Sequence, residues 1–210
     1  QHPRAMMENS KQALSIVLII MIGALAEPIR AGNAHVSAVY LACISCHGEN
    51  GWGSPPIRAP AIAGQPSVYL KKQLLDYRSG LRGTQSGDKW GAQMALMAQP
   101  LSDDDIAQLA LHLAEQALWP GATPNENPAP EAALPCLACH SKNRAGWTSS
   151  TAPILWGLSS DYLFRQLVAY RQGGRGGPVK GQAADPMTGV VSTSFSDDVL
   201  LDIARYFANE

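Results

Sequence analysis

The stretch Cys43-Ile44-Ser45-Cys46-His47 recurs in closely similar form as Cys136-Leu137-Ala138-Cys139-His140. Two thiols three residues apart, followed at once by a histidine, are the attachment pattern for c-type haem. The thiols can take the two vinyl groups, and the imidazole then faces the iron. The chain has four cysteines and all of them lie in these two stretches, so none is left for a structural disulfide. The motifs therefore predict two covalently bound haem c groups.

Zinc binding and a thioredoxin-like dithiol are the alternative interpretations of such cysteine pairs. Zinc would require both pairs to converge on one ion, whereas a dithiol needs neither the adjacent histidine nor a second copy. Haem attachment explains all of these features together.

The composition is typical of a folded globular protein, because 46% of the 210 residues are hydrophobic and 16% are charged. The net charge is −1. A nucleic-acid partner is not expected, since there is no basic stripe that could neutralise phosphates.

The N-terminal residues have the layout of a secretory signal peptide. Arg4 and Lys11 precede an apolar run over residues 13–26, and the segment ends in the small residues Gly32-Asn33-Ala34. Fourteen helical residues would rise only about 21 Å, against about 30 Å for the hydrocarbon core of a bilayer. We expect cleavage after Ala34 and a periplasmic mature protein. A retained 13–26 segment would instead associate the protein with the membrane.

The two motifs belong to an internal repeat with a register of 93 residues. Between residues 43–94 (the first repeat) and 136–187 (the second repeat), 19 of 52 aligned positions are identical. This register predicts two cytochrome c domains, 35–119 and 136–210, which follow the signal peptide 1–34 and are joined by a Pro-rich linker over 120–135.

The patterning predicts an all-α fold. A short helix is expected over 36–42 and another over 67–80, with Ser67 as its N-cap and Ser160 capping the copy. Residues 81–100 are expected to be irregular. Ser102 should begin a strong helix because three aspartates follow it, and the chain should end with the copy of that helix, beginning after Ser196.

The repeat also selects candidate iron ligands. His47 and His140 are the proximal ligands expected from the motifs. Met94 and Met187 each follow their motif histidine by 47 residues, and a thioether is a suitable sixth ligand for an electron carrier. Met97 aligns with Val190 and is expected to pack near the haem.

Two further sets of residues are expected to support the haems. Pro60 and Pro153 lie 13 residues after the motif histidines, where their carbonyls can accept the second ring N–H. They can also be explained as simple loop breakers. Guanidinium groups can bind the haem propionates, although a solvated helix end would account for them as well. The candidate pairs are Arg82 with Arg175, or Arg78 with Arg171.

With these residues the chain resembles the dihaem cytochrome c4 family, whose members consist of two class I cytochrome c domains. The resemblance rests on Cys43-x-x-Cys46-His47-Gly48, Pro60-Ala61-Ile62-Ala63-Gly64-Gln65, Tyr69-Leu70-x-x-Gln73-Leu74, Tyr77-Arg78-x-Gly80-x-Arg82, Met94 and residues 101–106. It implies two domains related by a pseudo-twofold axis, each wrapped around one haem. It also implies a periplasmic role in a respiratory chain, between a donor such as a quinol–cytochrome c reductase and an acceptor such as a terminal oxidase.

The second repeat departs from the family pattern. Ser141 replaces the usual glycine, Trp156-Gly157-Leu158 replaces Ala-Gly-Gln, and the helix before the motif is shortened to Ala129–Leu134.

An electron carrier that is not itself an enzyme is the expected function. The alternative is the electron-accepting cytochrome subunit of a periplasmic dehydrogenase, such as a flavocytochrome sulfide dehydrogenase. A dihaem peroxidase or thiosulfate-oxidising enzyme is less favoured, because such enzymes usually need an open or exchangeable iron ligand and two matched methionines argue against one.

Overall fold

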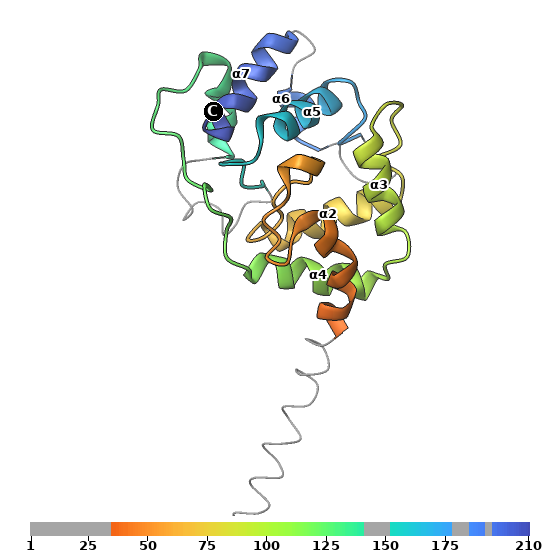
Figure 1. Cartoon of the computed structure of the whole chain (residues 1–210). Helices are drawn as coiled ribbons and strands as arrows, with labels where there is room; N and C mark the ends of the chain where they lie inside the picture. Colours follow the sequence, from red (N-terminus) through yellow and green to blue (C-terminus); the bar gives the residue numbers. More distant parts are fainter. Residues whose placement is uncertain (1–34, 141–151, 178–184, 192–194) are drawn as a thin grey trace, which may run out of the picture. The chain divides into compact units, whose positions relative to one another are not determined.

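Each half of the chain contributes one set of packed helices in the computed structural model (Figure 1). In the first half, α2 (Ser67–Arg78) packs against α3 (Lys89–Ala98) and α4 (Asp103–Glu115). In the second half, α5 (Ser160–Arg171) packs against α6 (Met187–Val190) and α7 (Asp197–Ala208). Short 3₁₀ helices are η1 (Pro55–Ile57), η2 (Glu131–Ala133) and η3 (Pro135–Ala138). The structure describes residues 35–140, 152–177, 185–191 and 195–210.

The all-α prediction is confirmed. Over the described ranges the chain forms no β-strand, and only an isolated bridge joins Ser54 to Ala59. None of the helices in the same ranges is long and apolar enough to span a bilayer. The proposed signal peptide, residues 1–34, lies outside the described residues. Residues 42–210 form one compact unit.

The last helix of each half begins as the sequence predicts. The Ser102 hydroxyl accepts a hydrogen bond from Asp105 N at 3.1 Å, and the Asp105 carboxylate accepts one from Ser102 N at 2.9 Å. This reciprocal pair is a capping box, which satisfies two N–H groups at the start of α4. Ser196 caps α7 by accepting a bond from Val199 N at 3.4 Å.

The caps predicted for the middle helices are wrong. α2 begins at Ser67 itself, with Pro66 in the N-cap position and no side-chain cap bond, because proline already sets the φ angle that leads into the helix. α5 is capped by Ser159, whose hydroxyl accepts from Tyr162 N at 3.3 Å. Ser160 instead donates its hydroxyl to Glu210 Oε2 at 2.5 Å.

The irregular segment expected over residues 81–100 contains α3, so that expectation is also wrong for its second part. The Asp88 carboxylate accepts from Gly91 N at 2.9 Å and caps the helix. The helix then continues through Ala, Gln, Met and Leu, all good helix formers. The cap and this composition decided the outcome.

The helix that precedes the second motif is short, as expected for Ala129–Leu134. It is reduced to η2, which is followed at once by η3. Pro130 and Pro135 flank η2 and lack the N–H that an α-helical ladder requires.

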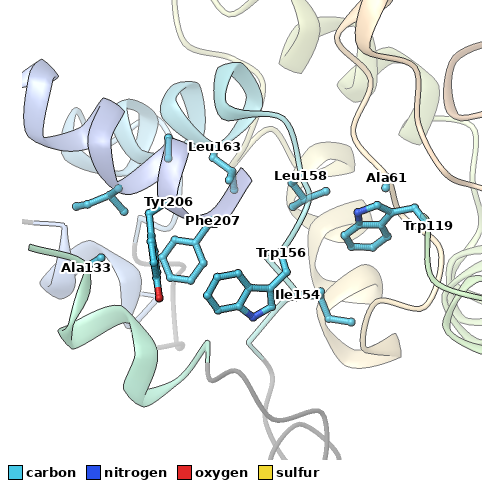
Figure 2. Close-up of a cluster of buried hydrophobic side chains, with 11 residues drawn as sticks. Ala61, Trp119, Ala133, Ile154, Trp156, Leu158, Leu163, Tyr206 and Phe207 are labelled. Carbon is cyan, nitrogen blue, oxygen red and sulfur yellow. The ribbon is translucent and has the colours of Figure 1, made fainter. Parts of the chain in front are cut away.

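The core beside the second motif is aromatic (Figure 2). The Trp156 ring centroid lies 4.7 Å from that of Phe207 and 5.6 Å from that of Tyr206. Phe207 in turn makes an edge contact with His140, with 6.4 Å between the ring centroids. Offset and edge-on geometries of this kind are the favoured arrangements of aromatic rings. The terminal helix α7 therefore packs directly against the motif histidine.

Candidate haem sites

The first motif forms the end of a helix, and the second begins within η3. Residues 43–47 are helical, and in the second motif His140 N donates to Cys136 O at 2.8 Å. Cys43, Cys46 and Cys136 are partly buried, and Cys139 is exposed. Within the part of the chain that the structure describes, no three His, Cys, Asp or Glu side chains converge as a metal site. The zinc alternative therefore gains no support.

Each motif histidine is tied to a proline carbonyl. His47 Nδ1 lies 2.9 Å from Pro60 O, and His140 Nδ1 lies 2.8 Å from Pro153 O. A carbonyl oxygen can only accept, so both imidazoles carry their proton on Nδ1. The Nε2 lone pair of each ring is then left to bind a metal, which is the arrangement expected of an oriented histidine ligand.

The surroundings keep both imidazoles neutral. His47 is 5% exposed and His140 is 3% exposed. Burial lowers the pKa of both histidines and outweighs the opposite effect of the proline carbonyls. Neutral imidazole is the form that ligates iron. Both side chains are therefore held in the protonation state that binds a metal, and not as charged imidazolium.

The candidate methionines are equivalent in the sequence register but differ in their position within a helix. Met94 lies within α3, and Met187 is the first residue of α6. Both are partly buried, whereas Met97 is 40% exposed. Met187 N donates to Asp185 Oδ1 at 3.0 Å, which fixes the start of the short helix.

A cavity of about 470 Å³ lies beside the second cysteine of the first motif. Its volume is within the usual range for a small-molecule or cofactor site. The side chains that line it come from the first motif, η1 and α3, and they are Cys46, Pro56, Ile57, Arg58, Lys89, Trp90 and Gln93. The cavity thus connects the attachment motif with the helix that carries Met94.

Arg82 and Arg175 are both buried, at 5% and 4% exposure, and their contacts cross between the repeats. Arg82 donates to Gln73 Oε1 at 2.6 Å and to Gln166 Oε1 at 2.5 Å. Arg175 donates to the same two oxygens, at 2.8 Å each. Tyr69 lies 3.0 Å from Arg175 Nη2. The helices α2 and α5 are therefore joined by two buried cations.

These two positive charges lack an anion among the described residues. Neither guanidinium forms an ion pair with a carboxylate there, and Arg175 Nε has no hydrogen-bond partner. The pKa of the nearby Tyr162 hydroxyl is lowered to about 8 because both arginines act against the effect of burial. Uncompensated buried charge is costly, so an anion of the cofactor is expected here. Two haem propionates fit this requirement.

Arg78 and Arg171 serve a different purpose. Arg78 donates to Leu101 O at 2.8 Å and pairs with Asp103, so it joins the end of α2 to the start of α4. Arg171 repeats the arrangement with Phe195 O at 2.8 Å and Asp197 at 2.5 Å. Because Arg78 and Arg171 already pair with carboxylates, whereas Arg82 and Arg175 bind only neutral groups among the described residues, Arg82 and Arg175 are the better candidates for propionates.

From the sequence we predicted no role for the glutamines. Gln73 and Gln166 bridge the two arginines, and Gln65 binds the main chain of Ile154. The available signal was that Gln73 and Gln166 are the same residue at equivalent positions of the repeat. Gln65 belongs to a stretch on which the family resemblance rests, but the internal repeat did not select it, because its counterpart is Leu158.

Comparison with known proteins agrees with this description. The cytochrome c family model matches residues 32–117. A "Thiosulfate dehydrogenase electron acceptor" of Stutzerimonas stutzeri is 34% identical over 85% of this chain and 82% of its own length. Cytochrome c4 of Pseudomonas aeruginosa is 32% identical over 77% of this chain and 83% of its own. The structure of reduced cytochrome c4 from Pseudomonas stutzeri superposes with a TM-score of 0.62 at 26% identity, covering 83% of this chain and 96% of that one.

The matched motifs, the helical fold and the extent of these similarities agree, and they identify the cofactor as covalently bound haem c. The chain belongs to the cytochrome c4 family of dihaem electron-transfer proteins.

Proposed function

We propose that this dihaem cytochrome is a periplasmic carrier that accepts electrons from a dehydrogenase and passes them towards a terminal oxidase. In this proposal residues 1–34 are removed on export. Domains 35–119 and 136–210, joined by the linker 120–135, each hold one haem.

The observation that carries the proposal is the repeated histidine–proline bond. It leaves Nε2 of His47 and of His140 free for iron in two equivalent settings. Met94 and Met187 complete the two sites as sixth ligands. Cys43 and Cys46 bind the first haem, and Cys136 and Cys139 bind the second. Haem supplies one-electron transfer, and the protein supplies ligands, orientation and a buried, electropositive setting.

The residues that orient and neutralise the cofactor follow from the contacts already described. Pro60 and Pro153 hold the imidazole rings, and Arg82 and Arg175 meet the propionates between the repeats. With two protein ligands on each iron, neither haem has a position for substrate, so chemistry other than electron transfer is not expected.

Ligation is tested by spectroscopy of the purified holoprotein. Both ferric haems should show the long-wavelength charge-transfer band of methionine–iron bonding, and neither ferrous haem should bind carbon monoxide readily at neutral pH. A high-spin haem that binds carbon monoxide would overturn the ligand assignment.

A dehydrogenase as donor is favoured by the relative named as a thiosulfate dehydrogenase electron acceptor. The test supplies the oxidised protein with thiosulfate and a thiosulfate dehydrogenase, or with quinol and a quinol–cytochrome c reductase. We expect rapid haem reduction in the first mixture. Reduction in the second mixture alone would make the quinol-linked route the donor instead.

A further inference from the structure

Gln65 in the first repeat binds both main-chain groups of Ile154 in the second. Its Nε2 donates to Ile154 O at 2.9 Å, and its Oε1 accepts from Ile154 N at 2.8 Å. Gln65 is 2% exposed and Ile154 is 5% exposed. Because a buried main-chain group without a partner is costly, this one side chain satisfies two requirements of the second repeat.

The bound peptide group is the one that orients His140. The N–H of Ile154 and the C=O of Pro153 belong to one planar peptide unit. The oxygen of that unit lies 2.8 Å from His140 Nδ1, and its N–H donates to Gln65. Fixing one end of a rigid plane fixes the other, and hydrogen bonds at both ends polarise the amide in the same sense.

We propose that Gln65 is a positioning residue for the second haem. It holds the Pro153–Ile154 peptide plane and so sets the strength of the hydrogen bond that His140 donates. The inference rests on the proposed role of His140 as an iron ligand.

Gln65 is itself held firmly. Gly64 N donates to Leu113 O at 2.7 Å, and Gly64 has φ +67, with Leu118 Cδ2 only 2.5 Å from where a Cβ would be. Pro66 follows and forms the N-cap position of α2. The side chain therefore projects from a short segment anchored at both ends.

The arrangement serves one haem only. In the second repeat Gly157 N donates to Phe207 O at 2.9 Å, which reproduces the backbone bond of Gly64. The next residue, however, is Leu158, which lies in the hydrophobic cluster of Figure 2 and has no polar side-chain atom to offer the Pro60–Ala61 peptide. The two histidine–proline bonds are alike in length. The Pro153–Ile154 peptide is bound by Gln65, whereas the residue equivalent to Gln65 for the Pro60–Ala61 peptide is Leu158.

The first test is a redox titration of Gln65→Leu, which gives the first repeat the residue found in the second. A strong Nδ1–H bond makes the imidazole a more basic ligand and favours ferric iron. Weakening it should shift the redox equilibrium of the second haem about tenfold towards the ferrous form, about 59 mV for one electron. The first haem should be unchanged.

Three further variants bracket this result. Gln65→Glu keeps an acceptor for Ile154 N–H and should not raise the potential of the second haem. Gln65→Asn retracts the amide by one methylene and should move the potential in the same direction as Gln65→Leu, which keeps the test available if the leucine variant does not accumulate. Gln108→Leu, at a glutamine that bonds Asp104 on α4, is the matched control and should change neither haem.

The second readout is solvent exchange of the ring Nδ1 protons, measured by NMR in the diamagnetic ferrous holoprotein. Exchange at His140 should be faster in Gln65→Leu, and exchange at His47 should not. Equal shifts in the reduction potentials of both haems would overturn the proposal. So would an unchanged potential of the second haem together with an unchanged exchange rate of the His140 Nδ1 proton. If wild-type His140 lacks the ring-current shifts of a haem ligand, the ligand assignment fails rather than the role of Gln65.

Discussion

The guanidinium groups of Arg82 and Arg175, which are equivalent positions of the repeat, bind the same two acceptor atoms. Each donates to Oε1 of Gln73 and to Oε1 of Gln166, one acceptor from its own repeat and one from the other. Each also lies over a tyrosine ring, Tyr77 at 4.4 Å and Tyr170 at 4.7 Å from the ring centroid. Two like charges held by shared neutral oxygens are costly without an anion, which supports the proposal that propionates from both haems bind at this cluster.

Replacing either arginine by methionine should destabilise the folded protein and lower the reduction potentials of the haems. Loss of charged hydrogen bonds in a buried cluster should lower the free energy of unfolding by about 2–3 kcal/mol. Loss of positive charge should stabilise ferric haem relative to ferrous haem and so lower the reduction potentials. Denaturant unfolding and redox titration of Arg82→Met and Arg175→Met measure both effects. Arg205→Gln, at an exposed arginine of α7, should stay within about 0.5 kcal/mol of wild type. Unchanged potentials in both variants would place the propionates elsewhere.

The methionine assignment predicts effects confined to one haem at a time. Met94→Ala should lower the potential of the first haem and let its ferrous form bind carbon monoxide, and Met187→Ala should do the same at the second. A thioether favours ferrous iron, so its loss favours ferric. Met97→Ala is the control and should leave both spectra unchanged. A carbon monoxide complex in Met97→Ala but not in Met94→Ala would reverse the assignment in the first repeat.

The two buried histidines predict an acid-side loss of stability. Their pKa values are lowered in the folded state from 6.5, so the unfolded chain binds more protons as the pH falls through that value. The stabilisation is complete above pH 6.5 and is lost progressively below it, by up to about 2.7 kcal/mol per pH unit for two groups. Guanidinium unfolding between pH 7 and pH 5 measures how the free energy of unfolding depends on pH, with His112→Asn as the control. A free energy of unfolding that does not change in this window contradicts the prediction.

Gly157 should not tolerate a side chain. It has φ +71, and a Cβ there would lie 2.2 Å from Gly121 O, a main-chain atom that cannot easily move. Gly157→Ala should therefore cost at least about 1–2 kcal/mol from backbone strain alone. Gly189→Ala is the matched control, because Gly189 lies in α6 with nothing within 4 Å of a Cβ, and it should be neutral or slightly stabilising. Thermal unfolding followed by circular dichroism compares the two. Equal melting temperatures would show that the loop adjusts.

Local patterns predicted much of the fold correctly. Ser102 and Ser196 begin α4 and α7 because the cap and the acids that follow act within one turn of the chain. The same reasoning failed for α3, which lies in a segment expected to be irregular although Asp88 caps a helix there. It also failed for Ser67 and Ser160, because the choice among adjacent cap candidates depends on contacts such as the one between Ser160 and Glu210.

By itself, the sequence determined the cofactor and the duplication. Two Cys-x-x-Cys-His motifs in a register of 93 residues need no tertiary information, since attachment chemistry is local and identity between copies is visible in the chain. Only the tertiary structure decided how the copies meet. The bond from Gln65 to Ile154 joins residues 89 positions apart, and the guanidinium of Arg82 reaches Gln166 across 84. No periodicity or motif encodes such contacts, because they exist only once two separately formed surfaces are packed together.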